Sequence, residues 1–351
     1  MTTDSGSIGI AGIATELADL RVGGEEFARL AGIPLDVVER RFGFRQTFRW
    51  GDGRGPMATG VRCASRALSG VHPEAIDLIC TLAHPYHPER EIYGYGAVLQ
   101  DALGANNAEL LEISDTCASV TLALQTIREL MCTEPDLTTV LVVGVLSMFQ
   151  NLDLSNPRTT WMANLSDGAG ALLLVRDPHL DNAVMETAQV VDAQFIDQIV
   201  LSSPYLDEPV TYRERFRRFL PAHVDVVDKD ALKRGLDEIA LPSFVAAIRE
   251  SVTRSGFTED QVDFIGANMM KRSLWQGLLE SFALAPDDQI FLDDVGHVGY
   301  LDQFLFLQRL RDERRLARGG VAVLATPGVG FHWTATTVAF KGPRLRGAVS
   351  A

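Results

Sequence analysis

The amino-acid sequence predicts an α/β protein made of two duplicated halves related by pseudo-two-fold symmetry. The chain has 351 residues, of which 46% are hydrophobic, so it can bury a core in each of two domain-sized halves. Apolar, β-branched runs recur between amphipathic helical stretches, which is typical of buried sheets in α/β folds. The two halves also repeat one order of motifs, which indicates a duplicated unit.

The expected strands are short apolar runs rich in β-branched residues. In chain order they span residues 76–80, 110–114, 140–145, 170–175, 262–265, 290–293, 321–325 and 336–340. We place the first half at residues 1–178 and the second at 179–351. Residues from about 192 to 230 are charged and include Pro204, Pro209 and the run 213–218, so we expect a connection or cap there.

The repeat pairs two potentially reactive side chains. Ala75-Ile-Asp-Leu-Ile79 has the form of Gln261-Val-Asp-Phe-Ile265, and each half closes on an apolar strand that starts near Leu141 or Val321. Cys117 precedes the first of these strands by 24 residues (141 − 117), and His297 precedes the second by 24 residues (321 − 297). Pseudo-two-fold symmetry would therefore bring both strand-to-helix turns together near the middle of the molecule.

Cys117 is the candidate nucleophile and would carry an acyl group as a thioester. It lies in Ser114-Asp-Thr-Cys-Ala-Ser119, after a predicted strand and at the start of a helix expected to run to about Leu130. Unpaired N–H groups and the helix dipole favour the thiolate at such a position. The alternative is a small buried hydrophobic residue, which is what most free cysteines are.

His297 is the candidate general base, because an imidazole can accept a proton near neutral pH. A core or capping histidine is the alternative, and the pairing with Cys117 favours the base. Asp302, five positions on, would orient the imidazole through a hydrogen bond, with Asp293 and Asp294 as alternatives. An acidic residue in a first helical turn can also simply complement the helix dipole.

A glycine-containing turn near the C-terminus is the candidate oxyanion site. In Thr326-Pro-Gly-Val-Gly-Phe-His-Trp333, Gly328 and Gly330 would let backbone N–H groups approach a ligand. The amides of Cys117 and Val329 would then stabilise a tetrahedral intermediate. An ordinary glycine turn is the alternative interpretation.

Charge and cysteine usage limit the partners and the compartment. The 46 acidic and 32 basic residues give a net charge of −14, which opposes binding to nucleic acids and anionic membranes. Four unclustered cysteines fit a reducing cytoplasm, and we expect neither a signal peptide nor a membrane span.

Two polar clusters invite further interpretations. His84, His87 and Glu89 lack the spacing of a zinc site, so we predict a loop and no metal. Several basic residues could hold donor phosphates, although charged runs are usually solvated faces. These basic residues are Arg41, Arg158, Lys271 and Arg272.

Four motifs in order resemble those of the thiolase superfamily, specifically its β-ketoacyl synthase III branch, over nearly the whole chain. They are Arg41-Phe-Gly-Phe-Arg45, Asp115-Thr-Cys-Ala-Ser119, Ser166-Asp-Gly-Ala-Gly170 and Gly328-Val-Gly-Phe-His-Trp333. The resemblance implies a thiolase-like five-layered αβαβα fold, a homodimer and a Cys-His-Asn site. It also implies an acyl donor on coenzyme A or acyl carrier protein, and no permanently bound cofactor.

The sequence departs from that family at two positions. Asn268, in Gly266-Ala-Asn, stands where the family has histidine, and His297 stands where it has asparagine. Family members use these side chains to stabilise an enolate during decarboxylation, so the exchange argues against carbon–carbon bond formation. Asn268 would contact substrate, hydrogen-bond His297 or fill the vacated space. Val37 also replaces a tryptophan that stacks on coenzyme A in some members.

The exchanged pair is similar to that of ketosynthase III-like acyltransferases of antibiotic biosynthesis, such as the cervimycin malonyl transferase. We therefore expect an acyltransferase that loads a thioester-borne acyl group, for example of malonyl type, onto Cys117 and passes it to a small-molecule hydroxyl or amine. A decarboxylating β-ketoacyl synthase III is the enzymatic alternative. A catalytically silent carrier-protein-binding or dimer partner is the alternative from another class.

Overall fold

Two sheets form the centre of the computed structural model, which describes residues 7–51, 55–82, 94–149, 152–159, 162, 164–203, 209, 223–268 and 271–342. In spatial order the first sheet contains β1 (Ile8–Leu17), β7 (Gly168–Arg176), β6 (Thr139–Leu146), β4 (Leu78–Leu82) and β5 (Glu109–Ile113). The second sheet contains β11 (Val262–Ala267), β12 (Gly320–Gly328), β13 (His332–Phe340) and β8 (Asn182–Val191).

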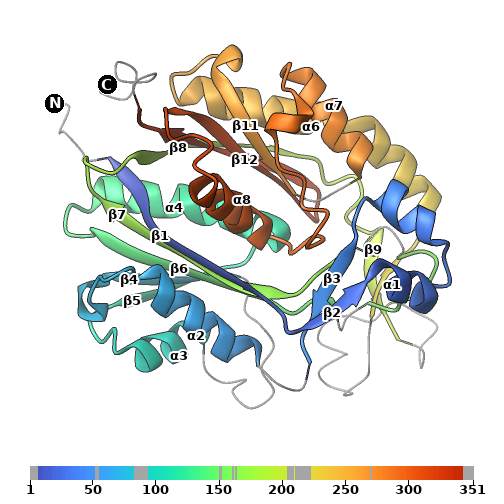
Figure 1. The fold of residues 1–351 in the computed structure, drawn as a ribbon, viewed down its shortest axis with the longest axis horizontal. Helices are drawn as coiled ribbons and strands as arrows, with labels where there is room; N and C mark the ends of the chain where they lie inside the picture. Colours follow the sequence, from blue (N-terminus) through green and yellow to red (C-terminus); the bar gives the residue numbers. More distant parts are fainter. Residues whose placement is uncertain are drawn as a thin grey trace.

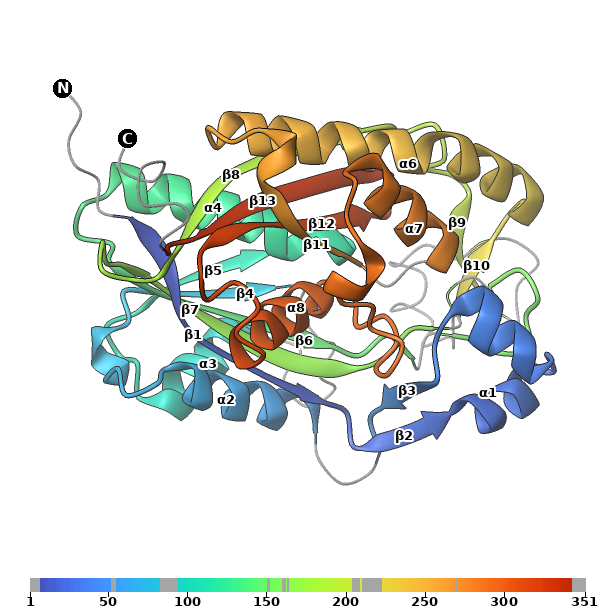
Figure 2. The same cartoon turned by 45° about the horizontal axis from the view of Figure 1, so that its top comes forward.

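Helices separate and cover the two sheets in five layers (Figures 1 and 2). One outer layer holds α2 (Pro56–Ala67) and α3 (Tyr95–Leu103), and the other holds α6 (Lys229–Arg254) and α7 (Arg272–Ser281). The central layer holds α4 (Ser119–Thr133) and α8 (Leu301–Asp312), which contact both sheets. The αβαβα arrangement agrees with the predicted fold class.

The two sheets repeat one pairing pattern. Strand β4 runs parallel to β6, which is followed by antiparallel β7 and β1. Strand β11 likewise runs parallel to β12, followed by antiparallel β13 and β8. The central helices α4 and α8 therefore precede equivalent strands, and each begins just after one of the two candidate reactive residues.

One predicted strand is wrong. Residues 290–293, the expected counterpart of β5, form a loop instead. Phe291 packs against the ring of Trp275 at 5.0 Å, and the Asp293 N–H donates to the Phe291 carbonyl in a tight turn. Ile290 and Leu292 are buried on either side. The apolar alternation in this segment thus reflects loop packing against α7.

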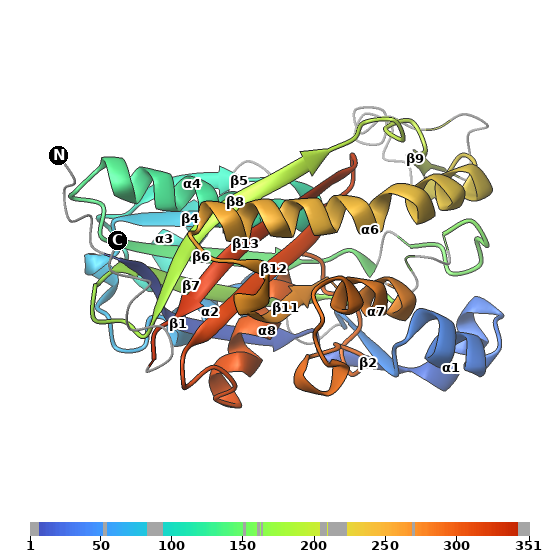
Figure 3. The ribbon, with the colours of Figure 1, turned by 90° about the horizontal axis from the view of Figure 1, so that it is seen from above.

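Smaller elements gather at one end of the molecule (Figure 3). There β2 (Leu20–Gly23) pairs with β3 (Gln46–Arg49), beside α1 (Gly24–Ala31) and the π-helical turn η1 (Val37–Phe42). Within the predicted connection, β9 (Ile199–Ser202) pairs with β10 (His223–Val226). The run 213–218 lies outside the described residues.

The central helices bury residues on more than one face because a sheet covers each of their two sides. Val120, Leu124 and Ile127 of α4 are fully buried, as is Phe304 of α8. Among the described residues, no helix is both long and apolar enough to cross a membrane.

Candidate active site

Cys117 lies in a tight turn between β5 and α4. The turn is the 3-10 segment η3 (Thr116–Ala118). Ser119 stabilises it, because its hydroxyl accepts the Asp115 N–H at 2.8 Å and donates to the Thr116 carbonyl at 2.8 Å. Cys117 remains partly exposed, so its sulfur is open to a substrate.

His297 lies in the equivalent turn before α8. Gly296 and Gly299 have φ angles of +72° and +56°, a conformation that glycine adopts without strain. The His297 N–H donates to the Asn164 carbonyl at 2.7 Å, and the His297 carbonyl accepts the Ser166 N–H at 2.7 Å. The second half thus supplies the imidazole, but backbone of the first half fixes its position.

The two turns bring three predicted residues into one chain of contacts. His297 Nε2 lies 3.6 Å from Cys117 Sγ, and His297 Nδ1 lies 2.7 Å from Asp302 Oδ2. The other oxygen of Asp302 accepts the Val298 N–H at 2.7 Å, and the carboxylate is fully buried. Cys117, His297 and Asp302 therefore have the geometry of a nucleophile, a base and an orienting acid.

The surroundings of His297 favour its protonated form. Burial alone lowers the pKa of an imidazole, but the charge and hydrogen bond of Asp302, together with Cys117, raise the pKa of His297 to about 10. An imidazolium beside sulfur stabilises a thiolate. The resting imidazole is thus suited to hold a proton next to the Cys117 sulfur.

The other cysteines have different environments. Burial raises the pKa of Cys63 and of Cys80 to about 12, so both remain thiols. Cys132 is exposed at the end of α4. All four cysteines of the described structure are free thiols, and Cys117 is the one that contacts His297.

The alternative orienting acids have other partners. Asp294 accepts two hydrogen bonds from Arg309, at 2.9 and 2.8 Å. Asp293 accepts a hydrogen bond from Arg45 at 3.1 Å. The contact with His297 is made by Asp302.

Asn268 lies close to this site but is engaged internally. Its Nδ2 donates to the Gly299 carbonyl at 3.3 Å, and its Oδ1 accepts from Gln303 Nε2 at 2.6 Å. The residue is 2% exposed. Gln303 also donates to the Ala325 carbonyl at 3.0 Å, so the pair fills the space between α8 and β12. Gln303 was not predicted as a site residue, because its helical position resembles that of any core residue.

The predicted oxyanion turn also adjoins Cys117. The Thr326 hydroxyl donates to the Cys117 carbonyl at 2.8 Å. The Val329 N–H, expected to face the substrate, donates to the Thr116 hydroxyl at 2.9 Å. Neither threonine was predicted as a site residue, although each lies within a motif that the sequence analysis had singled out.

The two predicted glycines of this turn differ in their surroundings. A Cβ atom on Gly328 would lie 2.0 Å from the ring of His332, so the ring packs directly on this glycine. His332 Nε2 lies 3.0 Å from an oxygen of Asp115, so the start of β13 lies next to the cysteine turn. Gly330 lies in the turn between β12 and β13.

The candidate phosphate-binding cations already have acidic partners. Arg158 holds Asp225 through both carboxylate oxygens, and this contact lowers the pKa of Asp225. Lys271 lies 3.1 Å from Asp237. Arg272 lies 3.9 Å from Asp293 and stacks over the Phe291 ring at 4.1 Å. These side chains are 52%, 45% and 39% exposed.

Arg41 lies within η1, and its side chain is outside the described part of the structure. Its segment approaches the start of α7, because a Cβ on Gly43 would lie 3.2 Å from Phe291 and 3.7 Å from Arg272. Val37 begins the same segment. His84, His87 and Glu89 lie outside the described residues, among which no metal-binding cluster is present.

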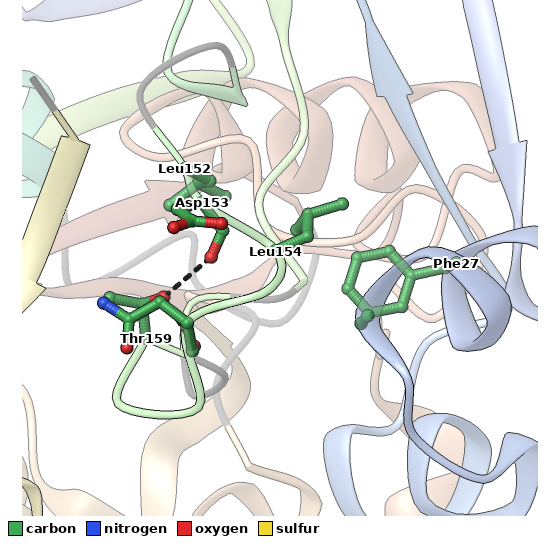
Figure 4. A pocket seen from close by; sticks show the side chains of 7 residues that line it. Phe27, Leu152, Asp153, Leu154 and Thr159 are labelled. Carbon is green, nitrogen blue, oxygen red and sulfur yellow. Dashed lines mark hydrogen bonds between the residues drawn. The ribbon is translucent and has the colours of Figure 1, made fainter. Parts of the chain in front are cut away.

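A small cavity lies apart from this site (Figure 4). It has a volume of about 10 Å³ and lies between Phe27 of α1 and the loop that contains Leu152, Leu154 and Thr159. That volume is enough for roughly one water molecule. The cavity therefore offers no room for an acyl donor.

Two family models match the chain. The model described as 3-oxoacyl-[acyl-carrier-protein (ACP)] synthase III matches residues 111–193, and its C-terminal model matches residues 252–340. These ranges contain Cys117 and His297, respectively.

Curated relatives align over nearly their full length. A β-ketoacyl-[acyl-carrier-protein] synthase III of Rhizorhabdus wittichii is 22% identical over 335 residues, covering 94% of this chain and 98% of the relative. The protein of the same name from Synechocystis sp. is 22% identical over 343 residues, covering 96% and 99%.

Solved structures share the fold. The priming β-ketosynthase of the R1128 polyketide biosynthetic pathway superposes with a TM-score of 0.81 at 19% identity, covering 96% of this chain and 97% of that one. Xanthomonas campestris OleA superposes with a TM-score of 0.76 at 16% identity, covering 95% and 98%. The chain thus shares the thiolase-like α/β fold of these structures, and its residues 111–193 and 252–340 are similar to 3-oxoacyl-[acyl-carrier-protein (ACP)] synthase III.

Proposed function

We propose that this protein is an acyltransferase that carries its acyl group on Cys117 and passes it to a hydroxyl or amine of a small molecule. The observation that carries the proposal is the contact chain from Cys117 through His297 to buried Asp302. An imidazole next to the nucleophile can serve both half-reactions, first as an acid and then as a base.

In the first half-reaction, the Cys117 thiolate attacks the thioester carbonyl of the donor. The tetrahedral intermediate collapses, the donor's carbon–sulfur bond breaks, and the departing thiolate takes the proton of His297 Nε2. The acyl group is then bonded to Cys117 and His297 is neutral. Loss of the thiolate also removes one of the influences that raise the pKa of His297.

In the second half-reaction, His297 Nε2 accepts the proton of the acceptor's hydroxyl or amine as that group attacks the acyl-cysteine. The sulfur leaves as a thiolate, an ester or amide is released, and the thiolate–imidazolium pair is restored. Asp302 stabilises the imidazolium without exchanging a proton.

The environment of Asn268 supports transfer without decarboxylation. Stabilising an enolate requires donors that are free to contact the thioester oxygen. Asn268 instead donates one of its two amide N–H groups to Gly299, accepts from Gln303 and is only 2% exposed, so little of it is open to a substrate. A malonyl-type acyl group would therefore keep its carboxylate during transfer.

We further propose that the donor is an acyl-coenzyme A or acyl carrier protein thioester, and that no cofactor is permanently bound. Arg272 and the segment containing Arg41 come together near α7 and are candidates to bind donor phosphates. Arg158 and Lys271 would have to share their charge with Asp225 and Asp237. The acceptor would be a small molecule such as a glycosylated natural product of antibiotic biosynthesis, and two copies of the chain would form a homodimer.

Decarboxylating condensation is the second candidate function, because the matched family and both curated relatives carry the name of a condensing enzyme. In that reaction His297 and Asn268 would stabilise an enolate from exchanged positions. A silent carrier-protein-binding or dimer-partner role is a third candidate, which requires no acyl group on Cys117.

Intact mass spectrometry after incubation with malonyl-coenzyme A or malonyl carrier protein tests the proposal. We expect one acyl adduct on the wild type and on Cys132→Ala, which removes the exposed thiol, and none on Cys117→Ala. An added alcohol or amine acceptor should discharge the adduct as an ester or amide. Stoichiometric carbon dioxide with a β-ketoacyl product and no ester would establish condensation instead, and absence of any Cys117 adduct would favour the silent role.

A further inference from the structure

The hydroxyl of Thr116 lies next to the Val329 N–H, in the place where that amide was expected to bind the oxyanion. The Val329 N–H donates to Thr116 Oγ1 at 2.9 Å. An oxyanion must lie 2.7–3.1 Å from its donors, so the hydroxyl oxygen stands where a substrate oxygen bound to that amide would stand. The amide cannot make both full-strength hydrogen bonds at once.

The backbone holds this hydroxyl in place. Thr116 has a φ of +49°, which is a genuine outlier for a β-branched residue. Such a conformation is strained and persists only where the surroundings impose it. The Ser119 hydroxyl donates to the Thr116 carbonyl at 2.8 Å, so bonds to both its carbonyl and its side chain fix this residue.

Neighbouring contacts fasten the two segments that meet at Thr116. On one side, Thr326 donates to the Cys117 carbonyl at 2.8 Å. On the other, His332 lies 3.0 Å from Asp115. The hydrogen bond from Thr326 therefore joins the end of β12 to the cysteine turn beside the bond from Val329 to Thr116, which limits the movement of the hydroxyl.

A hydroxyl that accepts one hydrogen bond still has a proton to donate. In the described part of the chain, Thr116 Oγ1 accepts from Val329 and has no acceptor for its own proton. The side chain is exposed, so a substrate can reach it. Polarisation by the Val329 amide would strengthen the hydrogen bond that the hydroxyl donates.

We propose that Thr116 is a catalytic residue whose hydroxyl, held by the Val329 amide, donates the second hydrogen bond to the oxyanion formed at Cys117. The inference rests on the proposed function, because it requires a thioester carbonyl at that sulfur. When the thiolate attacks, the carbonyl electron pair moves onto oxygen, and Thr116 stabilises that charge while keeping its own proton. The Cys117 amide would supply the other donor.

The test compares Thr116→Val with Thr116→Ser. Valine keeps the β-branched shape, removes the hydroxyl and frees the Val329 amide, whereas serine keeps the hydroxyl. We expect Thr116→Val to slow single-turnover acylation of Cys117 by malonyl-coenzyme A or acetyl-coenzyme A by about 100-fold, the usual effect of losing one oxyanion donor. Thr116→Ser should stay within about threefold of the wild type.

Alkylation by iodoacetamide separates catalysis from structure. This displacement depends on the thiolate but forms no oxyanion, so Thr116→Val should react at the wild-type rate. Acylation of Thr116→Val as fast as the wild type, or faster, would overturn the inference, because the freed amide would then be the donor. Equal slowing of acylation and alkylation would also overturn it, since it would indicate a displaced sulfur.

The wild-type measurement distinguishes this inference from the proposed function. If the wild type is acylated but Thr116→Val is not slowed, only the role of Thr116 fails. If neither thioester acylates Cys117 in the wild type, the proposed function fails and the role of Thr116 fails with it.

Discussion

His297 has to change its protonation state once in each half-reaction, and its two nitrogens have separate partners for this purpose. Nδ1 faces buried Asp302 and Nε2 faces Cys117. Asp302 therefore fixes the ring and leaves Nε2 to exchange protons. Because Asp302 also accepts the Val298 N–H, its position does not depend on the imidazole alone.

Replacing Asp302 with Asn tests this division of roles. Asn has nearly the same shape but no charge, so we expect the fold to remain and the pKa of His297 to fall from about 10 toward its ordinary value. Acyl transfer should fall by at least about 100-fold, because the amide can hold the wrong tautomer. Nuclear magnetic resonance titration of the imidazole and single-turnover transfer measure the two effects. If Asp302→Asn transfers acyl groups at the wild-type rate although the pKa of His297 is lowered, Asp302 is not required to orient the base.

At the scale of elements, the site depends on how the turns are anchored to the sheets. Asp167, in the predicted Ser166-Asp-Gly-Ala-Gly170 motif, is 2% exposed. Its carboxylate accepts the N–H groups of Met148 and Phe149 at 2.7 and 3.0 Å, just beyond β6. The motif thus fixes the backbone that follows β6, and the adjacent Ser166 binds the carbonyl of His297.

Asp167→Ala should lower the free energy of unfolding by about 3 kcal/mol, because it leaves the backbone N–H groups of Met148 and Phe149, among others, without their acceptor. Asp167→Asn keeps an acceptor oxygen and should lose less stability. Denaturant unfolding followed by circular dichroism measures both variants. Equal stability of the alanine variant and the wild type would refute this anchoring role.

Asp167 also predicts a pH dependence of stability. Burial raises its pKa to about 6, although the backbone hydrogen bonds oppose the shift. The native state therefore holds a proton that the unfolded chain has released, and this contribution to stability is lost as pH rises from about 4 through about 6. Relative to Asp167→Asn, the free energy of unfolding of the wild type should fall by at most about 1.4 kcal/mol per pH unit as pH rises through that window. A difference between the two unfolding curves that does not change with pH would contradict the shift.

The repeat made the central elements predictable from the sequence. Counting from Leu141 and Val321 placed Cys117 and His297 in equivalent turns, and spacing pointed to Asp302. The strand predicted at residues 290–293 was wrong, because an apolar alternation does not distinguish a strand from a loop that packs against a helix. The bond from Val329 to Thr116 was beyond prediction, because it depends on a positive φ and on contact between segments more than 200 residues apart.

At the scale of the whole molecule, β5 is an edge strand. It pairs with β4 on one side, and in the described structure its other side has no strand partner. Leu110 on this strand is 47% exposed. Unprotected edges with apolar side chains tend to pair with another chain. We expect two copies to associate through β5, next to the turn that carries Cys117.

Light scattering after size exclusion tests this expectation. The wild type should have twice the monomer mass of 38.4 kDa, and Leu110→Glu should shift it toward the monomer. Leu20→Glu is the matched control, because Leu20 on β2 is 42% exposed but lies away from the edge. A monomeric wild type would refute dimerisation, and a dimeric Leu110→Glu variant would refute this interface.

The two central helices begin close together, because Cys117 precedes α4 and His297 precedes α8. Each helix start carries roughly half a positive elementary charge, so the two starts repel each other unless an anion lies between them. The proposed reaction places one there in each half-reaction, as negative charge moves from the cysteine sulfur to a carbonyl oxygen in the first and to a second carbonyl oxygen in the next. A protein with a net charge of −14 can therefore sustain a sequence of anionic species at its centre.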